Sequence, residues 1–132
     1  MRTPSRNGRI FALAALTAAA LSGAAALAQA APAGHLNLSV TDAAGSTAAA
    51  TLDCPQGTGN HRYGDEACRQ LAAAGGDPDR LTGVPGMVCT KQYEPVQATV
   101  TGTWNGKPLH WQHTFGNSCE LHAATGAVFD LS

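Results

Sequence analysis

Four cysteines constrain the fold of this chain more strongly than any other feature of its sequence. They are Cys54, Cys68, Cys89 and Cys119. An even number of cysteines in a small exported chain predicts two disulfides, and four cysteines allow three pairings that the sequence alone does not separate. A zinc site is the alternative, but the spacing disfavours it because the chain has no C-x-x-C or H-x₃-H pair. We therefore expect no metal.

The first 30 residues have the build of a secretory signal peptide. Three arginines precede residue 10, apolar or small residues fill positions 10–27, and Ala28-Gln29-Ala30 forms a small-x-small cleavage site. A transmembrane anchor is the alternative because the run is about long enough to span a bilayer, but the alanine-rich composition and the cleavage site favour removal. We predict a signal peptide over residues 1–30 and a secreted, extracellular domain over residues 31–132, with no membrane association after removal.

Charge and size exclude several classes of function. Residues 31–132 carry five basic and nine acidic side chains, a net charge of −4, so this part is a poor candidate for binding nucleic acid or anionic membranes. The length of 132 residues is room for one domain. Such a domain buries a limited core, and each disulfide could add about 2–4 kcal/mol by restricting the unfolded chain.

Local patterns predict an α+β fold. Residues 36–41 alternate apolar and polar side chains, as in a half-buried strand, and residues 48–54 continue as a second, antiparallel strand. Asp65 is a candidate N-cap for a helix that runs to about Ala74, where Gly75-Gly76 ends it.

Asn105-Gly106 gives the clearest hairpin signal, because both central residues of a type I′ turn need positive φ. The register that follows pairs Trp104 with Lys107 and, at the far end, Val96 with Phe115. This register puts mostly apolar residues on one face of the hairpin.

The C-terminal residues predict two further elements, a short helix over residues 119–124 and a last strand over residues 127–131 with Phe129 pointing inward. The expected fold is therefore α+β, with a five-stranded antiparallel sheet, two short helices and two disulfides.

No catalytic constellation stands out in the sequence. Gly116–Glu120 is not a nucleophile elbow, and none of the five histidines has an evident nucleophile partner. We therefore expect neither an enzyme nor a cofactor.

The unusual stretch is Gly83–Pro95, which glycine and proline punctuate and Cys89 anchors. Lys91 is the only basic residue between Arg80 and Lys107. One interpretation is an edge strand with a solvated lysine. The other is an exposed loop, pinned by a disulfide, that offers Lys91 to a partner.

Five segments around the cysteines and the hairpin carry specific motifs. They are Leu52–Cys54, Asp65–Cys68, Met87–Val96, Thr101–Lys107 and Phe115–Glu120. In these motifs the chain resembles the Streptomyces subtilisin inhibitor family of secreted serine-protease inhibitors. The resemblance covers nearly all of residues 31–132.

The resemblance implies a substrate-like inhibitor of secreted serine proteases. Lys91 would enter the primary pocket of the protease, and the reactive bond would join Lys91 to Gln92. The contact loop would add Gly86, Met87, Val88, Cys89, Thr90 and Tyr93. A lysine suits trypsin-like pockets with an aspartate at the base, and a shallow subtilisin-like pocket could hold its apolar stem.

The resemblance also implies a five-stranded sheet with two helices and a homodimer formed through the sheet. The implied disulfides are Cys54–Cys68 and Cys89–Cys119. Asn117 matches a family asparagine that steadies the loop by hydrogen bonding to its backbone. Two departures are a shorter region over residues 36–54 and Glu94 where aspartate is more frequent.

Two alternatives keep the same scaffold without a protease target. One is a secreted binding module. The other is a transglutaminase substrate, which Gln92 and the lysines Lys91 and Lys107 suggest.

Overall fold

The structure is a computed structural model that describes Gly23 and residues 30–132. One antiparallel sheet has the strand order β3-β2-β1-β4-β5. The strands are β1 (Gly34–Thr41), β2 (Thr47–Cys54), β3 (Thr58–Gly59), β4 (Val96–Trp104) and β5 (Lys107–Phe115). The helical elements are α1 (Gly64–Ala73), the 3₁₀ turn η1 (Pro78–Arg80) and α2 (Ser118–Thr125). The expected α+β class is confirmed, whereas the predicted signal peptide lies outside the described residues except for Gly23 and Ala30.

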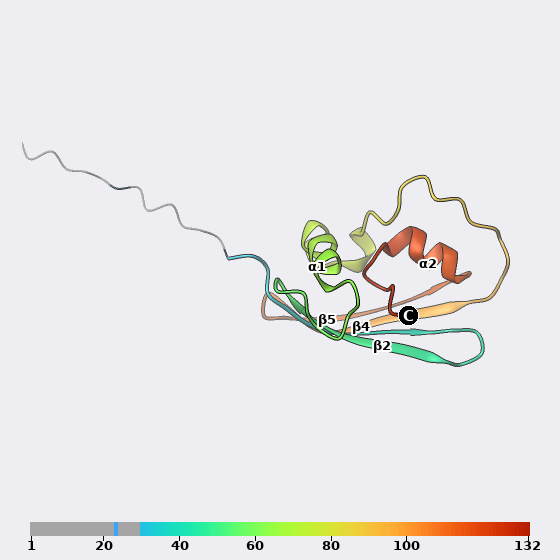
Figure 1. Ribbon diagram of the computed structural model, residues 1–132, viewed down its shortest axis with the longest axis horizontal. Helices are drawn as coiled ribbons and strands as arrows, with labels where there is room; N and C mark the ends of the chain where they lie inside the picture. Colours follow the sequence, from blue (N-terminus) through green and yellow to red (C-terminus); the bar gives the residue numbers. More distant parts are fainter. Residues whose placement is uncertain (1–22, 24–29) are drawn as a thin grey trace, which may run out of the picture.

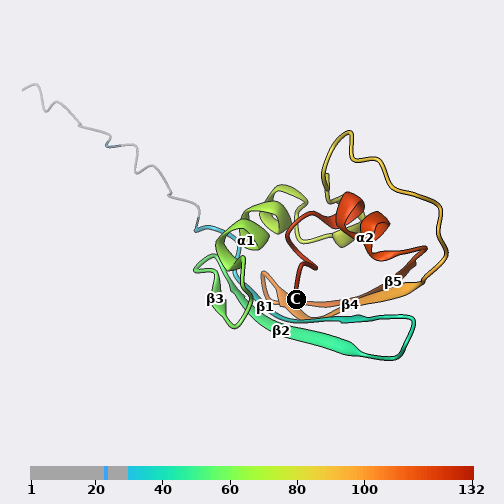
Figure 2. The same ribbon diagram turned by 45° about the vertical axis from the view of Figure 1, so that its right-hand side comes forward.

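The helices cover one face of the sheet, and no element of residues 30–132 covers the other face, here called the uncovered face (Figure 1, Figure 2). The core lies between the two layers because alternate residues of β1 and β4 point toward the helices. Its buried members are Leu36, Leu38, Leu52, Cys54, Ala67, Cys68, Leu71, Val96, Ala98, Val100, Trp104, Leu121, Val128 and Phe129. Among the described residues, no helix has the length and hydropathy needed to cross a membrane.

The β4–β5 hairpin has the predicted register. Asn105 and Gly106 both adopt positive φ, 50° and 76°, and Trp104 pairs with Lys107 while Val96 pairs with Phe115. The turn also holds the start of β1, because the Asn105 side-chain oxygen accepts a hydrogen bond from the Ala33 amide at 3.0 Å. A two-residue turn therefore positions three strands.

Helix α1 ends where Gly75-Gly76 was expected to stop it, but it begins differently. Tyr63 occupies the N-cap without a side-chain hydrogen bond, so the prediction that Asp65 caps the helix is wrong. Asp65 lies in the first turn, where its charge suits the helix dipole. Gly76 is required for packing, because a Cβ there would lie 2.3 Å from the Trp104 ring.

The fifth strand is not the predicted one. A turn closed by the Gly57 amide on the Asp53 carbonyl, at 2.8 Å, folds β3 back onto β2, where Thr58 pairs with Asp53. Residues 127–131 do not form a strand: the chain turns here, with the Val128 amide on the Thr125 carbonyl and the Asp130 amide on the Ala127 carbonyl. The Ala127 amide donates to the side chain of Gln70. Phe129 is buried as predicted. The short apolar run therefore predicted correctly that these residues are buried, but it did not predict their backbone conformation.

Candidate functional site

Residues 81–95 form a long loop, here called the exposed loop, between η1 and β4. In both views it arches away from the helical layer, past α2, before it enters β4 (Figure 1, Figure 2). Two large apolar side chains in it lie in solvent, with Val88 92% and Tyr93 78% exposed. Four of the five large apolar side chains that are exposed among the described residues belong to this loop, namely Val84, Met87, Val88 and Tyr93. Such a concentration is typical of a surface that contacts a partner.

A disulfide ties the middle of the exposed loop to the first turn of α2. Cys89 and Cys119 are bonded at 2.01 Å, with their Cα atoms 5.7 Å apart. The second disulfide joins Cys54 of β2 to Cys68 of α1, at 2.06 Å. Both pairings are those that the resemblance implies, and no described cysteine is free.

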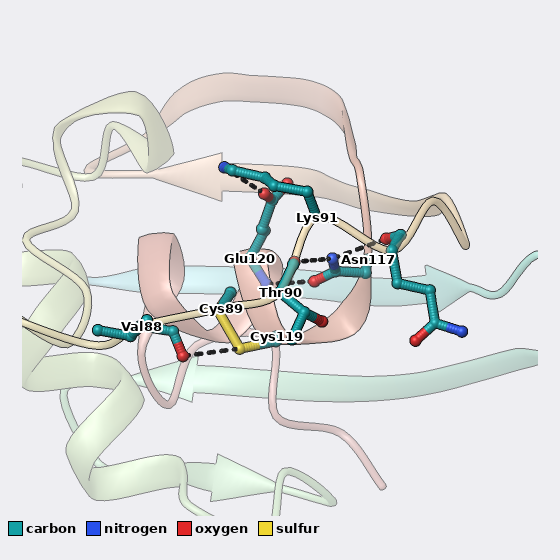
Figure 3. Close-up of polar contacts among 8 residues, drawn as sticks. Val88, Cys89, Thr90, Lys91, Asn117, Cys119 and Glu120 are labelled. Atoms are coloured by element: carbon teal, nitrogen blue, oxygen red, sulfur yellow. Dashed lines mark hydrogen bonds and ion pairs between the residues drawn. A yellow bond between two sulfur atoms is a disulfide. The ribbon is translucent and has the colours of Figure 1, made fainter.

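Asn117 connects the exposed loop to the N-terminus of α2. Its amide nitrogen donates to the carbonyl oxygens of Thr90 and Gln92, at 3.0 and 2.9 Å (Figure 3). Its side-chain oxygen accepts from the Glu120 amide at 2.8 Å and so caps the helix. A flipped amide would lose all three bonds, which fixes its orientation. Asn117 is 8% exposed, so a buried side chain is hydrogen-bonded to the backbone on both sides of Lys91.

Two backbone hydrogen bonds tie the ends of the exposed loop to the same region. The Val84 amide donates to the Ala123 carbonyl in α2, and the Glu94 amide donates to the Gly116 carbonyl, both at 2.9 Å. Pro85-Gly86 turns the chain between them, with Gly86 at a φ of 76° and the Met87 amide on the Val84 carbonyl at 3.3 Å. The loop is thus long but anchored at its start, middle and end.

Lys91 lies on the exposed loop but is not unpaired. Its ammonium donates to the Glu120 carboxylate at 2.9 Å (Figure 3). The Lys91 side chain is 89% exposed, whereas that of Glu120 is 29% exposed. The hydrogen bond from Lys91 and its positive charge lower the pKa of Glu120.

The sequence analysis missed Glu120 as part of this site. Its place in the first turn of α2 could have been predicted from sequence, because Asn117 and Glu120 have the spacing of a helix N-cap and the third helical residue. Its partner was not, because Lys91 lies 29 residues away.

The other predicted contact residues lie along the same loop. Gly86, Met87, Val88, Thr90 and Gln92 are exposed, as is Tyr93, while Cys89 is half-buried. The Gln92 side-chain amide donates to the Glu94 carboxylate at 3.2 Å. Glu94, where the resemblance implies that aspartate is more frequent, therefore bonds within the loop.

The histidines of the described residues have structural contacts, and His35 bonds to the Asp53 carboxylate at 2.8 Å. His61 is buried and bonds through its two ring nitrogens to the Val128 carbonyl and the Tyr63 amide. His113 lies against the rings of Trp111 and Phe115. Within residues 30–132 and Gly23, no three His, Cys, Asp or Glu side chains gather as metal ligands.

Comparison with known proteins identifies relatives of this arrangement. Residues 31–117 match the family model described as subtilisin inhibitor-like. The chain is 45% identical over 82 residues to subtilisin inhibitor-like protein 2 of Streptomyces rochei, covering 61% of this chain and 73% of the relative. It is 46% identical over 85 residues to a subtilase-type protease inhibitor of Streptomyces fradiae, covering 63% of this chain and 60% of the relative.

A solved structure has the same fold. Streptomyces caespitosus sermetstatin, crystallised in complex with Bacillus licheniformis subtilisin, superposes with a TM-score of 0.62 at 30% sequence identity. The superposition covers 75% of this chain and 98% of that chain.

Proposed function

Because the chain belongs to the subtilisin inhibitor-like family, a family of protease inhibitors and not of enzymes, we propose that it is a secreted, substrate-like inhibitor of serine endopeptidases. The reactive bond of this proposal joins Lys91 to Gln92. The observation that carries it is the pair of hydrogen bonds from Asn117 to the carbonyls of Thr90 and Gln92, which brackets this bond.

The anchored loop favours tight binding. Its backbone between Gly86 and Val96 has no regular secondary structure, so the amide and carbonyl groups that are not already bonded within the protein are available to pair with a protease cleft as an added strand. The disulfide and Asn117 already restrict its conformations. Binding therefore costs less entropy than it would for a flexible peptide.

The same anchors oppose hydrolysis. After cleavage of the reactive bond, the Cys89–Cys119 disulfide would still join the two pieces. Asn117 follows the cut, yet it bonds to Thr90, which precedes it. The new ends would stay close, so religation would compete with release. A rigid loop that binds well in its ground state without fitting the transition state inhibits instead of reacting.

Lys91 sets the proposed specificity. An extended ammonium would find a counter-ion in a trypsin-like primary pocket. A shallow subtilisin-like pocket would hold the apolar stem while the charge reaches water. An apolar chymotrypsin-like pocket would leave the charge buried without a partner, which disfavours it.

We further propose that the mature protein is a homodimer built on the uncovered face of the sheet. The face is lined by small, uncharged polar side chains at its centre, among them Asn37, Ser39, Thr99 and Thr101. The absence of charge from these four positions favours contact with a second, identical face.

Active-site titration of trypsin and of subtilisin with oxidised residues 31–132 tests the proposed function. We expect activity to fall linearly to near zero at one reactive site per enzyme. Lys91→Ala is the control, and it should lose trypsin inhibition while its unfolding transition stays unchanged, because Lys91 is exposed. Rapid cleavage after Lys91 without lasting inhibition would contradict the proposal.

A further inference from the structure

We infer that Glu120 is a positioning residue that weakens inhibition of trypsin-like proteases by holding the Lys91 ammonium in the free protein. The inference rests on the proposed function, in which Lys91 enters the primary pocket. It concerns a residue beyond the proposed contact loop, in the first turn of α2.

Glu120 is the fixed partner of the ion pair. Its amide donates to Asn117 at 2.8 Å, and its carboxylate lies against Gly116, where a Cβ would come within 2.7 Å of Oε2. The Lys91 side chain is far more exposed than that of Glu120. The lysine must therefore move if the pair is to open.

The pair holds the Lys91 ammonium to a carboxylate of the protein's own helix. Glu120 belongs to α2, and in the close-up view its side chain reaches from that helix to the ammonium of Lys91 (Figure 3). A side chain that fills a protease pocket must project away from its own protein. Entry of Lys91 into the pocket thus requires loss of the 2.9 Å contact.

The size of the effect follows from the exposure of the pair. Exposed ion pairs contribute little because water screens them and ordering two long side chains costs entropy. Removing the pair should therefore tighten trypsin inhibition by about two- to five-fold at low ionic strength. The gain should shrink as salt is added, because exposed charges are screened.

Glu120→Gln removes the charge and keeps the shape of the side chain, and Glu66→Gln is its matched control. Glu66 is also a carboxylate in the first turn of a helix and pairs with a basic side chain, Arg69, but it belongs to α1 and lies outside the exposed loop. Both substitutions change the net charge equally. Only Glu120→Gln removes the carboxylate that binds the Lys91 ammonium in the free protein and so competes with the protease pocket for it.

The experiment measures inhibition constants of full-length mature protein at low and high salt. We expect Glu120→Gln to inhibit trypsin about two- to five-fold more tightly than wild type at low salt, and Glu66→Gln to leave the constant unchanged. In a Lys91→Met background, tested against subtilisin, Glu120→Gln should have no effect. Two outcomes would overturn the inference and leave the proposed function standing. One is that Glu120→Gln weakens inhibition equally in the wild-type and the Lys91→Met backgrounds, and the other is that it does not change inhibition of trypsin.

The free protein supplies a second readout. The carboxyl of Glu120 should titrate at higher pH in Lys91→Met than in wild type, because the ammonium that lowers its pKa is gone. An unchanged titration would remove the premise of the inference. If wild type inhibits neither enzyme, the proposed function fails and the inference fails with it.

Discussion

Asn117 combines two tasks in one buried side chain, since its oxygen caps α2 and its nitrogen holds the exposed loop. Each hydrogen bond contributes about 0.5–1.5 kcal/mol net. Three bonds from a single residue make the helix terminus and the loop one structural unit. A substitution here therefore affects both stability and the proposed inhibition.

The two tasks of Asn117 can be separated by substitution. Asn117→Asp keeps the oxygen that caps α2 but loses the amide nitrogen that donates to the loop. Asn117→Ala loses the capping oxygen as well as the amide nitrogen, and loss of the cap lowers the free energy of unfolding by about 1 kcal/mol more. We expect trypsin to cleave both variants faster than wild type. Only Asn117→Ala should show the added loss in a denaturant unfolding experiment. Cleavage of Asn117→Asp at the wild-type rate would contradict the role of the donors.

The residues of the site differ in how far the sequence could predict them. The resemblance suggested Lys91 and Asn117, and the structure places the Asn117 bonds on either side of Lys91. The assignment of the reactive bond stays a prediction, as does the transglutaminase alternative at Gln92. Glu120 could not be paired with Lys91 from sequence, because an ion pair between distant residues depends on the folded path of the chain.

At the scale of elements, the two disulfides act on different connections. Cys54–Cys68 joins α1 to β2 across a separation of 14 residues, and Cys89–Cys119 joins the exposed loop to α2 across 30 residues. Both restrict the unfolded chain. Only the second spans the proposed reactive bond.

Replacing each cysteine pair by serine separates stability from inhibition. We expect Cys54→Ser/Cys68→Ser and Cys89→Ser/Cys119→Ser each to lose about 2–4 kcal/mol of unfolding free energy. Only the second variant should become a substrate whose two fragments separate on a non-reducing gel after trypsin treatment. Lasting inhibition by that variant would show that Asn117 alone retains the fragments.

Elements with strong local chemistry were predictable, and those set by tertiary contacts were not. Asn105-Gly106 fixed the hairpin register because positive φ is a local requirement. The two-residue strand β3 carries too little pattern to be found. The C-terminal apolar run is buried by packing against the core, and burial alone does not distinguish a strand from a turn.

At the scale of the whole molecule, the uncovered sheet face should control assembly. Thr101 lies in its middle, opposite Asn37 on β1 and His110 on β5. Thr101→Arg would bring like charges together across a two-fold interface. We expect sedimentation equilibrium to show a dimer for wild type and a monomer for Thr101→Arg. Ala72→Arg, on the exposed side of α1, is the control and should remain dimeric.

The strand order has a consequence for the connectivity of the molecule. Because β1 lies beside β4, with Leu38 opposite Val100, the chain before the exposed loop and the chain after it share the central ladder of the sheet. The Cys89–Cys119 bond and the Asn117–Thr90 contact cross the same divide. The peptide bond between Lys91 and Gln92 is therefore only one of several connections between these two parts of the chain. If this bond is cut, residues 31–91 and 92–132 should stay together as one folded domain made of two peptides.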